Sequence, residues 1–284
     1  MIAQYIRVGS IDEGLKVLEE HRPWGRVLAG GTDLLPKTRT ARHKRSLPLV
    51  LIDIKRIDEL KGIQMKEGRL CIGPSTTMSQ LAGSELVLEY APVLSLAAGQ
   101  VGSPEIRNRG TVGGNLGSKN TGADLLAPLA AMGALVEVRA PGGTSEIPVR
   151  DLLAAGWQGL GRSSLITEVR VPVNRQVTWG YRRWSRESMG RAYITALAGL
   201  EPRGDDRSCR FTAVLGGPGL WPRTFECQAR PGELSGQEPM LELCSRAAAE
   251  IFAAAGGAGG DYQFQIGRVA LAEALELAAG EVGQ

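Results

Sequence analysis

Two glycine-rich stretches far apart in the chain constrain its fold more than any other feature of the sequence. The first is RVLAGGTDLLP at Arg26–Pro36, and the second is GTVGGNLG at Gly110–Gly117. Each has an apolar approach, a pair of glycines and a small hydroxyl residue, followed by a turn. Glycine lets the backbone approach a ligand closely, and consecutive N–H groups in such a turn bind anions. The two stretches therefore predict one ligand held from two sides, most simply through a phosphate or pyrophosphate.

The first stretch differs from the common nucleotide-binding motifs. It contains neither the GxGxxG of dinucleotide-binding folds nor the GK[ST] of a P-loop. One glycine pair after a strand is most often only a tight turn, but two such pairs form a more specific pattern. Asn115 and Asp124, nine residues apart, add to it. Asp124 begins an apolar helix, so its carboxylate either caps that helix or accepts hydrogen bonds from ribose hydroxyls.

Composition narrows the class of protein. The 284 residues are 43% hydrophobic and 22% charged, which is typical of a globular protein with two domains or one domain with a smaller one appended. A net charge of +3 and 5% aromatic residues argue against binding to nucleic acid or to a membrane. Scattered cysteines (Cys71, Cys209, Cys227 and Cys244) and only two histidines (His21 and His43) argue against a metal site. Without a signal peptide or a spanning apolar run, we expect a cytoplasmic protein with reduced thiols.

The first 175 residues show alternating strand and helix patterns. A capping box at Ser10–Glu13 predicts a helix with Ile11, Leu15 and Leu18 on one face. Further expected elements are strands at Arg26–Ala29, Leu49–Ile54 and Leu165–Val171, hairpins of Gly62–Lys66 with Arg69–Gly73 and of Ala134–Arg139 with Thr144–Pro148, and helices at Met78–Leu81, Leu86–Tyr90, Val93–Val101 and Ala123–Met132. Residues 102–121 are predicted to form a long ordered loop, and the basic stretch Lys37–Arg45 either a solvated loop or an anion patch.

The pattern changes near Asn174. Three alternating segments, at Val177–Trp184, Ala192–Leu200 and Cys209–Leu215, predict antiparallel strands. Two alanine-rich amphipathic helices are expected to follow at Met240–Ala255 and Gly267–Ala279. This order is typical of a small α+β layer domain. We therefore expect domains at residues 1–175 and 176–284, the first divided into subdomains of about 1–57 and 58–175.

Several segments together carry a family resemblance. AGGTDLLP at 29–36, IGPSTT at 72–77, IRNRGTVGGNLG at 106–117 and ADLLAPLAAMGA at 123–134 resemble the FAD-binding medium subunit of the molybdenum hydroxylases. This family includes bacterial xanthine dehydrogenases and aerobic carbon monoxide dehydrogenases. The resemblance continues through LITEVRVP at 165–172, YRRWSR at 181–186, LGGPGLWPRTFE at 215–226 and YQFQIGRVALAEALELA at 262–278, so it covers essentially the whole chain.

The resemblance implies a fold and a set of cofactor contacts. The fold is a vanillyl-alcohol-oxidase-like, PCMH-type FAD-binding domain of two α/β subdomains, followed by an α+β domain with a three-stranded antiparallel sheet and helices. The first loop would bind the pyrophosphate and the second would lie opposite with its threonine hydroxyl and amides. Asp124 matches a ribose-binding aspartate, Ile166 an apolar contact, and Arg182 or Arg183 a basic residue beside the cofactor. The implied FAD contacts are Leu28, Ala29, Gly30, Gly31, Thr32, Asp33, Leu34, Leu35, Thr111, Gly113, Gly114, Asn115, Asp124, Ile166, Arg182 and Arg183.

Three places depart from the family pattern or match it only weakly. SKNTGAD at 118–124 replaces a more usual alanine and aspartate–proline pair. After YRRWSR, where many relatives place an acidic residue near the flavin ring, the stretch reads ESMGRAYI at 187–194. Tyr193 either packs on that ring or belongs to the core of a strand. Arg107 and Asn108 are weaker candidates for contact with the isoalloxazine. A side chain at Gly30 or Gly114 is expected to weaken FAD binding by blocking the approach of the backbone.

The implied activity is electron transfer. Substrate would be oxidised at a molybdopterin cofactor in a large partner subunit, and electrons would pass through 2Fe-2S clusters of a small subunit to FAD, then to NAD+ or another acceptor. A xanthine dehydrogenase-like complex is the first expectation, and a carbon monoxide, aldehyde or other N-heterocycle dehydrogenase is the alternative. No acid–base dyad or nucleophile–base pair is evident, so no catalytic residue is assigned. A stand-alone flavin oxidoreductase and a non-enzymatic nucleotide-binding module remain as rival classes.

Overall fold

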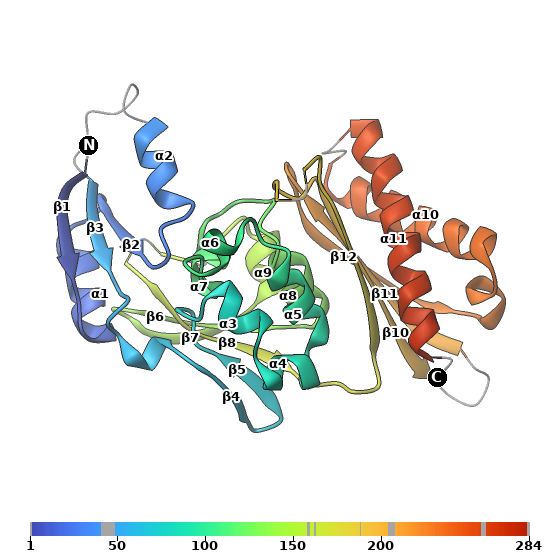
Figure 1. The fold of residues 1–284 in the computed structure, drawn as a ribbon, viewed down its shortest axis with the longest axis horizontal. Coiled ribbons are helices and arrows are strands. Elements are labelled where there is room, and N and C mark those ends of the chain that lie inside the picture. The colour runs from blue at the N-terminus through green and yellow to red at the C-terminus, as the bar shows by residue number, and fades with distance from the viewer. Residues whose placement is uncertain are drawn as a thin grey trace.

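Three sheets lie side by side along the long axis of the molecule (Figure 1). A computed structural model describes residues 2–40, 49–157, 160–161, 163–187, 189–203, 208–256 and 260–282. Residues 41–45 of the basic stretch, including His43, lie outside this part. Within it, the strands form a parallel sheet of three strands, an antiparallel sheet of five and an antiparallel sheet of four.

The N-terminal sheet has the order β1-β3-β2. Its elements are β1 (Ile2–Arg7), α1 (Ile11–Glu20), β2 (Gly25–Leu28), α2 (Leu34–Thr40) and β3 (Leu49–Asp53). The hydroxyl oxygen of Ser10 accepts a hydrogen bond from the Glu13 amide at 3.2 Å, which confirms the predicted helix start. Helix α1 buries Ile11 and Leu18 against this sheet. The first glycine stretch leaves the sheet at the end of β2 and leads directly into α2.

The central sheet has the order β4-β5-β8-β6-β7. Its strands are β4 (Ile63–Lys66), β5 (Arg69–Ile72), β6 (Leu135–Ala140), β7 (Gly143–Pro148) and β8 (Leu165–Pro172). Glu67 and Gly68 both have positive φ, so the predicted hairpin turns with the left-handed backbone that a two-residue connection favours. Every second residue of β8 is buried, which places one face of the sheet on a core and leaves the other more open.

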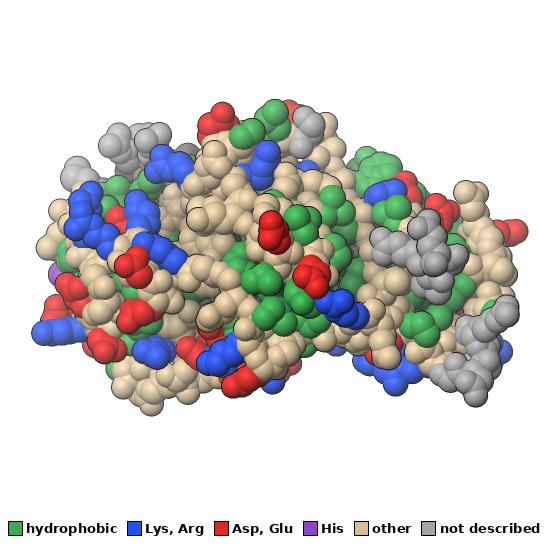
Figure 2. Space-filling model, turned by 60° about the horizontal axis from the view of Figure 1, so that its bottom comes forward, with side chains coloured by type: hydrophobic (Ala, Val, Ile, Leu, Met, Phe, Trp, Pro, Cys, Tyr) green, Lys and Arg blue, Asp and Glu red, His purple; other side chains and the backbone are tan. Residues whose placement is uncertain are grey.

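Short helices lie before and between the strands of the central sheet in the chain, and several of them pack on its buried face. They are η2 (Asp58–Leu60), α3 (Met78–Ala82), α4 (Glu85–Tyr90), α5 (Pro92–Gly99), α6 (Pro104–Arg107), α7 (Val112–Gly117), α8 (Leu126–Ala131) and α9 (Val149–Ala154). All residues of α8 are buried, as its apolar sequence predicted. Figure 2 shows hydrophobic side chains gathered on the middle of one face, where α4 and α5 come forward. Leu88 and Leu96 on these helices are exposed.

The C-terminal sheet is buried on both faces. It consists of β9 (Thr178–Trp184), β10 (Ile194–Arg203), β11 (Ser208–Gly217) and β12 (Leu220–Ala229), and η3 (Pro231–Leu234), α10 (Gln237–Ala254) and α11 (Gly260–Val282) follow it. Tyr181, Leu197 and Val214 pack on the core beneath the central helices. Ala196 and Phe211 face α10 and α11 instead. The sheet therefore joins the central part of the molecule to the two long helices (Figure 1).

The predicted α+β class is confirmed, with corrections to several of its elements. The last sheet has a fourth strand, β12, where we expected three. Pro222 argues against a strand in the sequence, but β12 pairs only with β11, and an edge strand tolerates proline. Two short helices, α6 and α7, interrupt the predicted long loop. Strand β1 and helix α9 were not expected, and the exposed, irregular pattern of β1 explains its weak signal. In the described part, no helix is long and apolar enough to cross a membrane.

Candidate functional site

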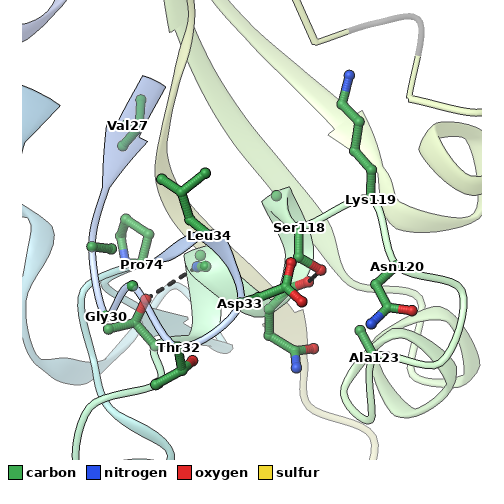
Figure 3. Close-up of a pocket in the computed structure, with 18 of the residues that line it drawn as sticks. Val27, Gly30, Thr32, Asp33, Leu34, Pro74, Ser118, Lys119, Asn120 and Ala123 are labelled. Carbon is green, nitrogen blue, oxygen red and sulfur yellow. Dashed lines mark hydrogen bonds between the residues drawn. The ribbon is translucent and has the colours of Figure 1, made fainter. Parts of the chain in front are cut away.

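A cavity of about 790 Å³ lies where the two glycine stretches meet. Most of its lining residues come from four segments, within residues 25–34, 110–124, 160–166 and 183–191. Figure 3 shows Gly30 and Thr32 on one side of this space and Lys119 and Asn120 on the other, with Asp33 and Ser118 between them in this view. The predicted meeting of the two stretches around one site is therefore present in the fold. A space of this size is typical of a cavity for a small molecule or cofactor.

The first glycine loop presents unused backbone donors. The N–H groups of Gly30, Gly31, Thr32 and Asp33 donate no hydrogen bond to any residue that the structure describes. All four residues line the cavity. Gly31 has φ of 74°, a conformation that favours glycine. Consecutive free amides at a turn can bind a phosphate or carboxylate oxygen, so this loop fits an anionic group.

Gly30 is required by contact between the two loops. A Cβ atom built on Gly30 would lie 2.0 Å from the carbonyl oxygen of Arg109 and 2.9 Å from the Cα atom of Gly110. No side chain can occupy that space without moving the backbone. We expected this glycine to allow the approach of a ligand, but its closest neighbour is the second glycine stretch. Its absent side chain is what lets the two walls of the cavity join.

The second loop uses its backbone donors inside the protein. The bonds run from Val112 N–H to Thr76 O (2.9 Å), from Gly113 N–H to Pro74 O (2.8 Å), from Gly114 N–H to Thr111 Oγ1 (3.1 Å) and from Asn115 N–H to Thr111 O (2.8 Å). Thr111 caps α7 through its hydroxyl oxygen, and the Asn115 side chain accepts a bond from the Leu125 amide at 3.2 Å. This loop therefore forms a firm wall of the cavity, whereas we had expected its amides to be available to a ligand.

A buried ion pair lines the cavity. Nε of Arg183 donates to Oδ1 of Asp124 at 2.7 Å, and the two side chains are 4% and 10% exposed. Burial raises the pKa of Asp124 above its ordinary value, while the hydrogen bond and charge of Arg183 act against that rise. Asp124 does not cap α8, whose N-cap is Leu125. Its carboxylate instead fixes the arginine at the edge of the cavity.

The structure distinguishes the two candidate arginines on β9. Neighbouring residues of a strand point to opposite faces of the sheet. Arg183 lines the cavity, whereas Nε of Arg182 lies 3.3 Å from Glu273 Oε2 on α11. Arg182 does not line the cavity, and neither does Leu35. The other predicted positions do: Leu28, Ala29, Gly30, Gly31, Thr32, Asp33, Leu34, Thr111, Gly113, Gly114, Asn115, Asp124, Ile166 and Arg183.

Three weaker candidates lie elsewhere. Arg107 donates to the carbonyl oxygens of Val101 (3.3 Å) and Gly102 (2.8 Å), and Asn108 accepts a bond from the Ser79 hydroxyl at 2.6 Å. The ring of Tyr193 packs at 5.6 Å from that of Tyr262. None of the three lines the main cavity. The structure thus gives each of them a partner within the protein.

Further lining residues were not predicted from the sequence. Arg191 lines the cavity and reaches Asp33, 158 residues away in the chain, with 3.3 Å between Nη2 and Oδ1. Lys119 has positive φ and lies between Ser118 and Asn120. The only signal in the sequence that could have indicated Lys119 is the glycine-rich stretch that precedes it. Arg191 has no local signal, because only the tertiary fold brings it to the first loop.

Comparison with known proteins decides the family. Residues 1–174 match the family described as the FAD binding domain in molybdopterin dehydrogenase. The chain belongs to this family. The alpha subunit of the 6-hydroxypseudooxynicotine dehydrogenase complex of Paenarthrobacter nicotinovorans is 30% identical over 222 residues, which cover 75% of this chain and 72% of that protein. The xanthine dehydrogenase FAD-binding subunit of Escherichia coli O157:H7 is 33% identical over 148 residues, 52% of this chain and 49% of that one.

The fold has a solved counterpart. One chain of the carbon monoxide dehydrogenase of Hydrogenophaga pseudoflava superposes with a TM-score of 0.79 at 24% identity, covering 99% of this chain and 98% of that chain. The expected combination of a PCMH-like FAD domain with a C-terminal α+β domain is confirmed. This chain is therefore an FAD-binding oxidoreductase subunit of the molybdenum hydroxylase family.

The residues present fit the cofactor that the family implies. FAD carries an anionic pyrophosphate, for which the first loop offers free N–H donors. It also carries ribityl and ribose hydroxyls, which a carboxylate such as Asp124 can accept hydrogen bonds from. Among the described residues, no group of three His, Cys, Asp or Glu side chains is arranged to hold a metal ion. The free N–H donors of the first loop suit an organic anion.

Proposed function

We propose that this FAD-binding subunit relays electrons within a larger complex. A small 2Fe-2S subunit would deliver electrons, a large molybdopterin subunit would oxidise the substrate, and NAD+ or another acceptor would receive the electrons. The observation that carries this proposal is the row of free amides in the first loop, which line the same cavity as the Asp124–Arg183 pair. The names of the relatives, which describe subunits of dehydrogenases, support the larger assembly.

We assign the cofactor contacts as follows. The amides of Gly30–Asp33 bind the pyrophosphate, and the second loop supplies the opposite wall with Thr111 at its start. Leu28 and Ile166 give apolar contact, and Arg183 lies at the end with Asp124. In this assignment residues 1–175 hold FAD and residues 176–284 cover it, because Arg183 and Arg191 complete the cavity from beyond β8.

The chain itself positions and tunes the cofactor. FAD supplies the hydride and single-electron chemistry when bound. The first loop holds its anionic group through backbone N–H donors, which carry no proton that titrates near neutral pH. The Asp124–Arg183 pair keeps a fixed, nearly water-excluded charge pair at the other end of the cavity. This division of roles explains why no acid–base dyad is required in the chain.

For the substrate, we propose a xanthine dehydrogenase-like complex, supported by the similarity to the xanthine dehydrogenase FAD-binding subunit. A complex acting on carbon monoxide, an aldehyde or another N-heterocycle is the alternative. We also propose a cytoplasmic location, because the four cysteines are free and scattered and reducing compartments keep such thiols unpaired.

The test begins with the purified chain. Reconstituted with FAD, it should show flavin absorption bands and hold one FAD per chain; a protein that stays colourless would exclude an FAD-binding role. The chain alone should not oxidise xanthine, whereas the complex isolated with its co-purifying subunits should reduce NAD+ in the presence of xanthine. Turnover of a small molecule by the isolated chain would instead favour a stand-alone flavin oxidoreductase.

A further inference from the structure

Asp33 connects the first glycine loop to a distant part of the chain. Its N–H group is the last in the row of free amides, it lies just before α2, and its side chain is about one-quarter exposed (26%). Its carboxylate pairs with Lys37, one helical turn further on, and with Arg191 at 3.3 Å between Nη2 and Oδ1. Lys37 is only four residues from Asp33, so the Asp33–Lys37 pair does not connect the loop to a distant part of the chain. Arg191 lies between β9 and β10, and its pair therefore crosses from the C-terminal sheet to the loop.

Arg191 follows a residue that is held by hydrogen bonding. The carbonyl oxygen of Gly190 accepts a hydrogen bond from Nη2 of Arg183, the arginine that also binds Asp124. Both carboxylates of the cavity are thus held by arginines from the same stretch of the C-terminal part. Three contacts form a series: Asp124 pairs with Arg183, Arg183 donates to the carbonyl oxygen of Gly190, and the next residue, Arg191, pairs with Asp33. The Arg191–Asp33 pair is the most exposed step in this series, with Arg191 71% exposed.

The charge of Asp33 creates a problem for an anionic ligand. A carboxylate beside the four free amides repels a pyrophosphate bound to them, unless cations offset its charge. Lys37 and Arg191 together provide that compensation. Arg191 comes from the segment between β9 and β10, so its pair with Asp33 also ties the loop to the C-terminal part of the chain. Loss of Arg191 would therefore both expose the pyrophosphate to the Asp33 charge and release the loop from β9 and β10.

We propose that Arg191 is a cofactor-retaining residue that acts through Asp33. This inference rests on the proposed binding of FAD pyrophosphate by residues 30–33. By pairing with Asp33, Arg191 holds the first loop against the C-terminal part and slows the release of bound FAD. It is a positioning residue, because it acts through the carboxylate and the loop. An exposed ion pair of this kind changes an equilibrium or a rate by about two- to fivefold and is weakened by salt.

The experiment measures FAD release from the full chain. FAD-loaded wild type and R191Q are mixed with an excess of an FAD-binding apoprotein as a trap, and the absorbance change gives the dissociation rate. R191Q should release FAD about two- to fivefold faster at about 0.05 M salt, and the difference should shrink at about 0.5 M salt. The matched control is Arg175→Gln. Arg175 is similarly exposed (64%) and pairs with Glu89 away from the cavity, so its loss should leave the rate unchanged.

A double variant tests whether Arg191 acts through Asp33. In a D33N background, R191Q should have no further effect on FAD release, because the pair is already lost. Equal release by wild type and R191Q overturns the inference, and so does a full effect of R191Q in D33N. These results leave the proposed function intact as long as wild type binds FAD. Failure of wild type to bind FAD would reject the proposed function and the retaining role together.

Discussion

The two glycine loops resemble each other in sequence but differ in how they use their backbone donors. In the first loop, the N–H groups of residues 30–33 have no partner among the described residues. In the second loop, four successive N–H groups, from Val112 to Asn115, all donate within the protein. The loops touch where Gly30 meets the backbone of Arg109. One loop is thus available to a ligand, and the other supports it.

This difference shows that glycines in similar sequence motifs can have different structural roles. Gly31 allows positive φ, Gly30 allows close contact between loops, and Gly113 leaves room for Pro74, whose Cβ would lie 2.5 Å from a Cβ on Gly113. Only the first of these concerns the conformation that exposes the amides. The ion pairs of the two loops also differ in burial. Asp33 in the first loop pairs with an exposed arginine, whereas Asp124, which follows the second loop in the chain, pairs with a buried one.

The largest effect is expected from Arg183→Gln. It leaves the buried carboxylate of Asp124 without its cation, which costs about 3–5 kcal/mol of unfolding free energy. Arg182→Gln is the matched control, because its pair with Glu273 is partly exposed and contributes about 0.2–1 kcal/mol. Urea unfolding of both variants measures the difference. Equal losses of unfolding free energy in the two variants would show that the Asp124–Arg183 pair does not behave as a buried ion pair.

The loss in Arg183→Gln should depend on pH. Burial raises the pKa of Asp124 in the folded state, so the folded chain binds a proton there more tightly than the unfolded chain does. Such a group favours folding where it is protonated, and this benefit is lost as pH rises through the raised pKa. Removal of Arg183 takes away an opposing influence and raises the pKa further. The penalty should therefore be smaller near pH 5 than near pH 8.

A second test compares glycines from the two loops. Gly30→Ala places a Cβ against the Arg109 carbonyl and should destabilise the FAD-free chain by about 1–3 kcal/mol, as overpacking does. Gly117→Ala, at the end of the second stretch, has no atom within 4 Å of its new Cβ and should change stability by less than about 1 kcal/mol. Thermal unfolding without FAD measures both. Full stability of Gly30→Ala would contradict the direct contact between the loops.

Substitution of the two threonines sharpens the comparison further. Thr111→Val removes the hydroxyl that accepts from Gly114 and should cost about 0.5–2 kcal/mol, the range for loss of a helix N-cap. Thr32→Val keeps the shape of a side chain that makes no hydrogen bond to the described residues, and should change stability by less than about 0.5 kcal/mol. If Thr32→Val costs as much as Thr111→Val, the first loop is also internally bonded.

The smallest effect uses no substitution. Inorganic pyrophosphate at a concentration equal to its dissociation constant should slow hydrogen exchange about twofold at the amides of residues 30–33. The amides of residues 112–115 should already be protected and should show no change. Mass spectrometry of peptides from each loop separates the two signals. Protection that appears in the second loop alone would reverse the assigned roles.

Prediction from sequence succeeded where the signal is local. The cap at Ser10, the turn at Glu67–Gly68 and the buried run of α8 each depend on neighbouring residues, and each lies where it was expected. It failed for β12 because Pro222 is acceptable only in an edge strand, and the edge position depends on the whole sheet. Helices α6 and α7 were missed because a glycine-rich segment has weak helical periodicity.

The candidate site shows the same limit. Fourteen of the sixteen expected cofactor contacts line the cavity, since motif spacing follows the local chain. The choice between Arg182 and Arg183 required the orientation of β9 against α11. Arg191 required the meeting of two segments that are 158 residues apart. No local pattern encodes such a meeting, because it results from the packing of the three sheets.

The sequence alone determined the two glycine loops, the class of ligand and the family resemblance, because these depend on residue types at short spacing. The tertiary structure decided which loop has free donors, which of Arg182 and Arg183 lines the cavity, and that Arg191 pairs with Asp33. Hydrogen-bond partners are the physical reason. A glycine pair is open to a ligand or bonded to the protein according to the acceptors beside it, and here the carbonyl oxygens of Pro74 and Thr76 accept hydrogen bonds from the second loop.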